Sequence, residues 1–136
     1  MVYTCITGGY DKPAGDVVSR PDVDYVCFTD DADLIGSRDG VWEYRRPVFD
    51  EADNILTSRR HKMSPHRLFP EYEYSLWIDG NIVIAQDGFY ARMEDLMAAG
   101  TQLACLSHPQ RDDIYDEAFK VVANGRDTLC NVLRTV

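Results

Sequence analysis

YSLWIDGNIVI, residues 74–84, contains two short apolar runs separated by an acid, a glycine and an amide. The runs at 76–78 and 82–84 are typical of buried strands. A glycine inside such a pattern indicates a bulge, or a close approach of backbone or ligand. Asp79 and Asn81 flank it at a spacing that, in a strand, sends both side-chain oxygens to one side. Two such oxygens are suitable ligands for a hard divalent cation, and such a cation can bind a diphosphate.

The same residues have a simpler interpretation. Asp-Gly is a strong short-range signal for a hairpin, so Asp79 and Gly80 are equally consistent with a tight turn between two strands. Spacing alone does not separate a metal-binding interruption from a turn.

The chain has 136 residues and a formal net charge of −9. This length predicts one domain, residues 1–136, with a real hydrophobic core. The acidic balance argues against binding to nucleic acid, because phosphate recognition normally relies on a basic patch. A phosphate ligand would therefore need a metal ion or a few local cations to offset the acidic side chains.

Cysteine usage and hydropathy bear on the compartment. The four cysteines are far apart and show no zinc-site spacing, and most lie in apolar runs where a small buried thiol is ordinary. Met1 directly precedes the first apolar run, and no run approaches the about 18 apolar residues of a membrane span. We therefore expect no transmembrane segment and a cytoplasmic setting, with a peripheral position at a membrane left open.

Several other stretches predict strands, namely residues 2–7 (VYTCIT), 24–29 (DYVCFT), 41–46 (VWEYRR) and 103–106 (LACL). Runs that are apolar on both faces favour a sheet covered on both sides. The first strand ends at Gly8 and Gly9, which allow unusual backbone angles, so Tyr10 and Asp11 follow its carboxyl end. Asp30 follows the second strand in the same way.

Helices are expected between these strands. One begins at Asp53 or Asn54 and is stopped or kinked by Pro65, and another covers residues 89–99. A third is capped by Asp112 or Asp113 and continues to about Ala123, and a short one is expected at 127–133. The side chains expected to face the core are Ile55, Leu56, Met63, Phe89, Met93, Leu96, Met97, Ile114, Phe119, Val122 and Ala123.

The densest positive charge lies just before the Asp79 strand and comprises Arg59, Arg60 and Lys62, with His61 and His66. A solvated helix face and an anion-binding face explain this cluster equally well. If a diphosphate lay between a metal ion at Asp79 and one or two of these cations, both the metal and the side chains would neutralise its negative charge. His108 is a candidate base only, because a histidine before a proline is more often a turn residue.

Strands alternating with helices, with polar groups at strand ends, predict an open α/β sheet with ligands at its carboxyl edge. In that setting the blocks VYTCITGGYD, DYVCFTDD, SRRHKMSPHRLFPEYEYSLWIDGNI and LSHPQRDDIYDEA resemble, in order, a glycosyltransferase-like domain family. The family, first catalogued as a domain of unknown function, occurs in plant wall-polysaccharide and bacterial surface-polysaccharide proteins. The resemblance implies a GT-A-like, Rossmann-like open mixed sheet with helices on both faces, shortened at the C-terminus.

The resemblance also implies a nucleotide-sugar donor, UDP- or GDP-linked, bound with Mn²⁺ or Mg²⁺, and a glycan or polysaccharide acceptor. Asp79 and Asn81 take the place of the family's DxD motif as metal ligands. The other implied donor-binding residues are Thr7, Gly8, Tyr10, Asp11 and Asp30 beside the nucleoside, and Arg59 and Lys62 facing the phosphates. No catalytic base or nucleophile is assigned.

The resemblance is to the N-terminal, donor-binding part of the domain, because GT-A enzymes usually have roughly a hundred residues more. One alternative is a donor-binding or structural remnant without turnover, completed by a partner chain or a homodimer. Another is a hydrolase that uses the same metal site with water as the acceptor.

Overall fold

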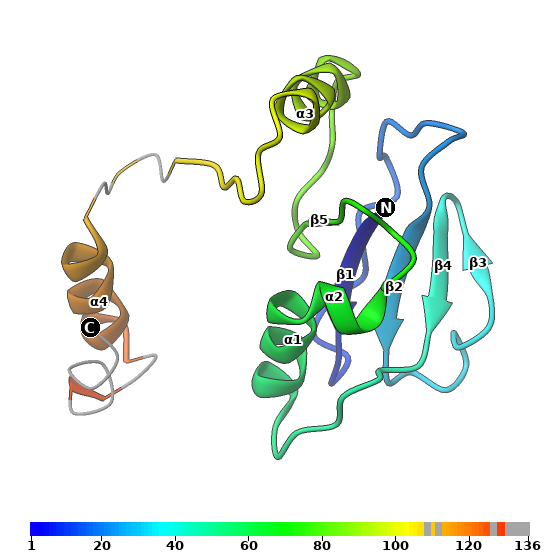
Figure 1. Ribbon diagram of the computed structural model, residues 1–136. Coiled ribbons are helices and arrows are strands. Elements are labelled where there is room, and N and C mark those ends of the chain that lie inside the picture. Colours follow the sequence, from blue (N-terminus) through cyan, green and yellow to red (C-terminus); the bar gives the residue numbers. More distant parts are fainter. Residues whose placement is uncertain (108–109, 111–112, 126–127, 130–136) are drawn as a thin grey trace. The chain divides into compact units, whose positions relative to one another are not determined.

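The computed structural model describes residues 1–107, 110, 113–125 and 128–129. It separates into two compact units, Met1–Gly100 and Thr101–Val136, and each is described by itself. The elements of the first unit, shown in Figure 1, are β1 (Val2–Ile6), β2 (Tyr25–Thr29), β3 (Arg38–Asp39), β4 (Trp42–Arg45), α1 (Asn54–Met63), α2 (Pro65–Leu68), β5 (Leu76–Trp77) and α3 (Gly88–Ala98). The second unit contributes α4 (Ile114–Ala123).

The sheet of the first unit is five-stranded, in the order β3-β4-β2-β1-β5. β1 pairs in parallel with β2 and β5, and β2 pairs in parallel with β4, whereas β3 is antiparallel to β4. The strand order reverses at β1, with β2 on one side of it and β5 on the other. The carboxyl ends of these strands therefore meet at one edge, where ligands bind in open α/β folds. The predicted α/β class with a mixed sheet is confirmed.

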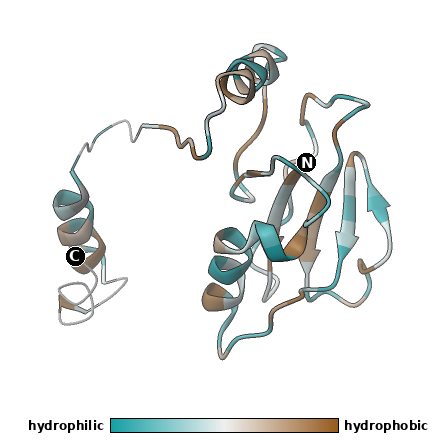
Figure 2. Cartoon of the chain, in the orientation of Figure 1, coloured by the Kyte–Doolittle hydropathy of each residue, from teal (hydrophilic) through white to brown (hydrophobic). Residues whose placement is uncertain are grey.

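Both faces of the sheet are covered, because every residue of β1 and β2 is buried. Side chains of β1 alternate between the two faces. Val2 and Ile6 pack with Val17, Ile84 and Tyr90 on one face. On the other face, over which α1 and α2 lie (Figure 1), the core consists of Tyr3, Cys5, Val26, Phe28 and Phe69. In Figure 2, which colours the chain by hydropathy, β2 is largely hydrophobic and the edge strand β3 is hydrophilic.

Helix α1 begins where it was predicted, but the buried face differs from the prediction. Asp53 caps it by accepting the backbone N–H of Leu56. Ile55 and Met63 were expected inside, and they are 64% and 76% exposed. Leu56 is exposed as well. The buried side chains are instead polar, Thr57 and His61, and both accept backbone N–H groups of the segment before α1, from Glu51 and Val48.

The segment after β5 also departs from the prediction. The backbone N–H of Ile82 donates to the carbonyl of Asp79 at 2.9 Å, which closes a β-turn over residues 79–82. The second predicted strand, 82–84, does not form, and only Ile84 of that run is buried. The strand-spacing argument that placed Asp79 and Asn81 on one side therefore does not apply.

The remaining predictions have mixed outcomes. The α3 stripe of Phe89, Met93, Leu96 and Met97 is half-buried, while Tyr90 is the buried residue of that helix. Cys5 and Cys27 are buried, and burial raises the pKa of both thiols to about 12, but Cys105 is exposed. Among the described residues, none of the helices has the length and apolar character that a membrane span requires.

In the second unit, Asp113 caps α4 by accepting the backbone N–H of Tyr115 at 2.6 Å. The strand predicted at 103–106 does not form. So short an apolar run carries no periodicity from which a strand could be recognised. Phe119 and Ala123, expected inside, are exposed, and Val122 is half-buried. The side chain of Ile114, together with His108, Asp112, Cys130 and most of the predicted helix at 127–133, lies outside the described residues.

Candidate functional site

The candidate site lies at the carboxyl edge of the sheet, where the chain leaves three neighbouring parallel strands. Thr7 and Gly8 follow β1, Asp30 follows β2, and Asp79 comes two residues after Trp77, the last residue of β5. Gly8, Asp30 and Asp79 are exposed there, whereas Thr7 is buried. The parallel topology therefore gathers, from distant parts of the sequence, four of the residues predicted to bind a donor.

Gly8 and Asp30 are directly joined. The Gly8 N–H donates to both carboxylate oxygens of Asp30, at 3.0 Å and 2.8 Å. Gly8 has φ of 73°, a left-handed conformation that favours glycine. A Cβ at this position would also overlap the side-chain amide of Asn54, the first residue of α1. The loop after β1 is thus held between the end of β2 and the start of α1.

Thr7 fastens the same loop to α1. Its hydroxyl donates to the Asn54 carbonyl at 3.2 Å, and the Ser58 hydroxyl donates to the Cys5 carbonyl at 2.9 Å. These bonds place the amino end of α1 beside the carboxyl end of β1. The buried Thr7 side chain therefore helps to hold the start of α1 against the end of β1.

Tyr10 and Asp11 lie further along the loop. The Tyr10 side chain is 90% exposed. Asp11 accepts the backbone N–H of its neighbour Lys12 at 2.8 Å. In the part of the chain that the structure describes, no hydrogen bond or ion pair connects either residue to Asp30 or Asp79. Tyr10 and Asp11 remain donor-binding predictions.

Asp79 has two partners, and both reach the same oxygen. The Trp77 indole Nε1–H donates to Oδ1 at 2.7 Å, and Lys62 Nζ lies 3.4 Å from that atom. The ammonium group also lies 5.5 Å from the centroid of the Trp77 ring. Because the Asp79 and Lys62 side chains are 60% and 46% exposed, their ion pair contributes only about 0–1 kcal/mol. The structure thus brings Lys62 to Asp79, in an arrangement that is easily broken.

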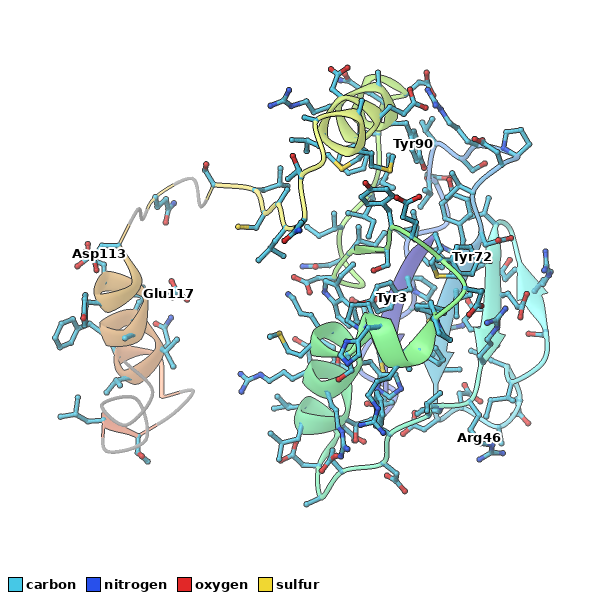
Figure 3. The ribbon with its side chains drawn as sticks, in the orientation of Figure 1. Tyr3, Arg46, Tyr72, Tyr90, Asp113 and Glu117 are labelled. Atoms are coloured by element: carbon cyan, nitrogen blue, oxygen red, sulfur yellow. The ribbon has the colours of Figure 1, made fainter. Side chains whose placement is uncertain are left out.

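Tyr3, a residue of β1, contacts both partners of Asp79, and sequence reasoning did not identify it. Its hydroxyl donates to the Lys62 carbonyl at 3.2 Å, and its ring meets Trp77 edge-on with centroids 5.3 Å apart. Figure 3 labels Tyr3. Burial raises the pKa of Tyr3 to about 12, so this hydroxyl keeps its proton at neutral pH. No local pattern could have revealed it, because a tyrosine in an apolar strand looks like any core residue.

Gly80 lies close against the end of β1. An added Cβ would come within 2.6 Å of Ile6 Cδ1 and 3.1 Å of Cγ1. Gly80 is therefore a point of close approach, but to a buried side chain of β1 and not to backbone or a ligand as predicted. Asn81 is exposed within the same turn.

The predicted cluster of positive charge is divided between different environments. Arg59 is exposed on α1, three residues before Lys62, a spacing that places both on one side of the helix. Arg60 forms an ion pair with Glu51 and lies 4.7 Å from the centroid of the Phe49 ring. His66 is exposed on α2.

His61 is not part of the charged cluster. It is fully buried, its Nδ1 bonds the Thr57 carbonyl at 2.7 Å, and its Nε2 lies 3.0 Å from the backbone N–H of Val48. Since Nε2 accepts that N–H, the ring is neutral with its proton on Nδ1. Burial lowers the pKa of His61. Its role is to anchor α1 in the core.

The predicted metal ligands at this edge, Asp79 and Asn81, lie in the turn over residues 79–82 and not on one face of a strand. Asp79 and Asn81 offer carboxylate and amide oxygens, and Asp79 Oδ2 accepts no hydrogen bond from the described residues. Mg²⁺ is commonly held by one or two carboxylates together with substrate phosphates and water. Across the described ranges, no group of three or more His, Cys, Asp and Glu residues is arranged to hold a metal ion. A cation at Asp79 would therefore depend on oxygens of its ligand.

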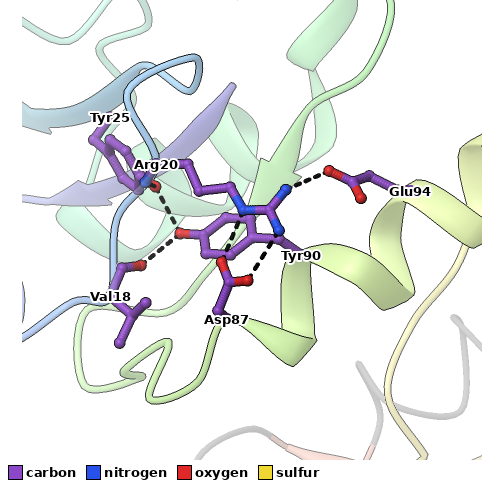
Figure 4. Close-up of polar contacts among 6 residues, drawn as sticks. All are labelled: Val18, Arg20, Tyr25, Asp87, Tyr90 and Glu94. Carbon is purple, nitrogen blue, oxygen red and sulfur yellow. Dashed lines mark hydrogen bonds and ion pairs between the residues drawn. The ribbon is translucent and has the colours of Figure 1, made fainter.

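A second network, also missed by sequence reasoning, holds the segment that follows the turn (Figure 4). The Arg20 N–H donates to the Tyr25 hydroxyl at 3.1 Å, the Tyr25 and Tyr90 hydroxyls lie 2.6 Å apart, and Tyr90 donates to the Val18 carbonyl at 2.7 Å. The Arg20 guanidinium binds both oxygens of Asp87, at 2.8 Å and 3.1 Å, and pairs with Glu94. These bonds attach α3 to the connection that precedes β2.

An open α/β sheet with acidic and basic side chains at its carboxyl edge defines a Rossmann-like domain that would bind its ligand there. The family model of the TOD1/MUCI70 glycosyltransferase-like domain matches residues 40–132, more than half of the chain, so the chain belongs to this family. The matched segment includes Arg59, Lys62, Asp79 and Asn81, and begins after β1 and β2.

The chain is also similar to the "Probable hexosyltransferase MUCI70" of Arabidopsis thaliana, with 31% identity over 75 residues. That alignment covers 55% of this chain and 13% of the relative, so the chain spans only a small part of the relative's length. No solved structure matches the chain.

Proposed function

We propose that this glycosyltransferase-like domain binds a nucleotide-diphosphate sugar, with a UDP or GDP nucleotide, at the carboxyl edge of the sheet. In this proposal the sugar is transferred from that nucleotide donor to a glycan or polysaccharide acceptor. The observation that carries this proposal is the meeting of Lys62 and Asp79 at the end of β5, 3.4 Å apart, inside the segment that matches the family. A metal-bound diphosphate needs a carboxylate to bind the metal ion and a nearby positive side chain to bind a phosphate oxygen, and Asp79 and Lys62 are of these two kinds.

In this proposal Asp79 and Asn81 hold Mn²⁺ or Mg²⁺. The cation would stabilise negative charge on the departing diphosphate. Lys62 leaves Asp79 and binds a phosphate oxygen, a rearrangement that costs little because the exposed ion pair is weak. Arg59, on the same side of α1, adds a second positive charge. These local charges offset the formal net charge of −9, which would otherwise repel a diphosphate.

The nucleoside lies against the loop after β1 in this proposal. Gly8 and Asp30 hold that loop in one conformation, and Tyr10 presents an almost fully exposed ring on which a base can stack. Asp11 is close in sequence and provides a hydrogen-bond acceptor for the sugar ring of the nucleoside.

A thermal-shift titration tests the proposal. The chain would be titrated with UDP, GDP and CMP, each with and without Mn²⁺, because a ligand that binds only the folded state raises the melting temperature. We expect a rise with one nucleotide that requires Mn²⁺ and is lost in Asp79→Ala. Asp22→Ala is the matched control, since Asp22 is an exposed acid that precedes β2 at the opposite edge of the sheet.

The proposal is wrong if no nucleotide shifts the melting temperature of the wild type, or if Asp79→Ala responds as the wild type does. Incubation with the matching nucleotide sugar then separates transfer from hydrolysis. Release of free sugar without any acceptor, at a rate that an added glycan does not change, would indicate a metal-dependent hydrolase instead.

A further inference from the structure

Trp77 is the firmest contact of Asp79. The two residues are separated by one position, and the indole Nε1–H reaches forward to Asp79 Oδ1 at 2.7 Å. A hydrogen bond from a neutral N–H to a carboxylate is charge-assisted and stronger than a neutral one. The other partner of that oxygen, Lys62, lies at 3.4 Å on a flexible and partly exposed side chain.

The indole itself is held in place. Trp77 ends β5 and is paired with Tyr3 in the parallel register of β5 with β1. The ring of Tyr3, which is buried, packs edge-on against the indole with centroids 5.3 Å apart. The N–H that reaches Asp79 therefore belongs to a residue of a sheet strand, whereas the carboxylate is exposed and lies in a turn.

This difference in rigidity has a consequence for the carboxylate. An exposed aspartate in a turn ordinarily samples several rotamers, and binding a cation then costs the entropy of fixing one of them. Here Oδ1 is fixed by the indole, and Oδ2 accepts no hydrogen bond from the described residues. One oxygen is thus oriented in advance and the other is open.

We propose that Trp77 is a positioning residue that orients the Asp79 carboxylate for a divalent cation through its indole N–H. This inference depends on the proposed function, because it assumes a cation at Asp79. Hydrogen-bond partners of metal ligands typically change metal affinity by about 10 to 100-fold when they are removed. Trp77 touches neither donor nor acceptor in this role.

The test compares two tryptophan variants of the full chain. Trp77→Phe keeps an aromatic ring on Tyr3 but removes the N–H donor. Trp42→Phe is the matched control, because Trp42 Nε1–H also donates to an oxygen, the Ala14 carbonyl at 3.0 Å, away from the edge. Free Mn²⁺ would be measured by electron paramagnetic resonance in the presence of UDP, or of whichever nucleotide shifts the melting temperature.

We expect Trp77→Phe to weaken Mn²⁺ binding by about 10 to 100-fold, with Trp42→Phe unchanged. The melting temperature without nucleotide or Mn²⁺ should fall no further in Trp77→Phe than in Trp42→Phe, since a purely structural effect of Trp77 would lower it as well. Equal Mn²⁺ affinity in the wild type and Trp77→Phe would overturn this inference and leave the proposed function intact. Failure of the wild type to bind Mn²⁺ would overturn both.

A second measurement needs no metal and no change at Trp77. The chain has two tryptophans, so ¹⁵N-indole labelling gives two side-chain N–H resonances, and Trp42→Phe assigns them. Asp79→Ala should shift the Trp77 resonance towards the value of a free indole and leave Trp42 in place. If the Trp77 resonance does not move, the hydrogen bond does not form in solution and the inference is wrong.

Discussion

The backbone N–H of Gly8 donates to both carboxylate oxygens of Asp30, which joins the chain leaving β1 to the chain leaving β2. Only a left-handed glycine can present its N–H in this way while passing so close to Asn54. The contact thus fixes the loop that the proposed nucleoside would touch. Gly8 and Asp30 both lie outside the family-matched segment.

Gly8→Ala should lower the free energy of unfolding, measured by urea denaturation. A left-handed conformation at a non-glycine residue costs of order 1–3 kcal/mol, and the new Cβ would also overlap the Asn54 amide. Gly9→Ala is the matched control, because Gly9 has φ of 62° with nothing within 4 Å of an added Cβ. We expect the larger loss in Gly8→Ala. Equal losses would show that Asn54 moves aside freely.

Tyr90→Phe should destabilise the first unit by about 1–3 kcal/mol, because it leaves the buried Tyr25 hydroxyl and the Val18 carbonyl without their shared partner. Tyr72→Phe removes a hydroxyl that bonds the exposed Asp24, so its effect should be smaller. Urea denaturation gives the two values, and hydrogen exchange should show faster exchange in α3 for Tyr90→Phe alone. A larger loss in Tyr72→Phe would contradict this ranking.

His61 should make stability fall as the solution becomes acidic. Burial lowers the pKa of His61 in the folded chain, whereas the unfolded value is about 6.5. Between the two values the unfolded state binds more protons, so the free energy of unfolding is greatest above pH 6.5 and decreases as the pH falls towards the folded pKa. Urea denaturation between about pH 7.5 and pH 5 measures this dependence.

His61→Gln should have lower stability throughout and a flatter pH dependence in that interval, since the titrating ring is gone. His66→Gln is the control, because it removes an exposed histidine of α2 and should leave the stability nearly unchanged. The assignment to His61 fails if its removal leaves the slope of stability against pH as steep as in the wild type.

Lys62→Met separates stability from binding. The ion pair with Asp79 joins two partly exposed side chains, so its loss should change the free energy of unfolding by less than about 1 kcal/mol. If Lys62 binds the diphosphate, the same change should weaken metal-dependent nucleotide binding by about tenfold or more, measured by calorimetry. Arg92→Met on α3 provides an exposed-cation control. Unchanged nucleotide affinity would remove Lys62 from the proposed site.

Several features of this chain were determined by local sequence. β1, β2 and β4 form where apolar and β-branched runs predicted strands, and α1 lies between the capping Asp53 and Pro65. These signals act over a few residues, through side-chain burial, capping bonds and the missing N–H of proline, so they can be recognised without a partner. The family resemblance, carried by ordered motifs, is likewise confirmed by the family match.

Only the tertiary structure decided which side chains meet. The run at 82–84 has the composition of a strand, yet the chain turns at residues 79–82, since a strand needs a neighbouring strand as well as a pattern. On α1 the hydrogen-bonded residues Thr57 and His61 are buried and Ile55 is exposed. Hydropathy predicts the opposite arrangement, because it does not register hydrogen-bond partners. The bonds between Gly8 and Asp30 and between Tyr25 and Tyr90 span long sequence separations, so they exist only once the parallel sheet has brought their elements together.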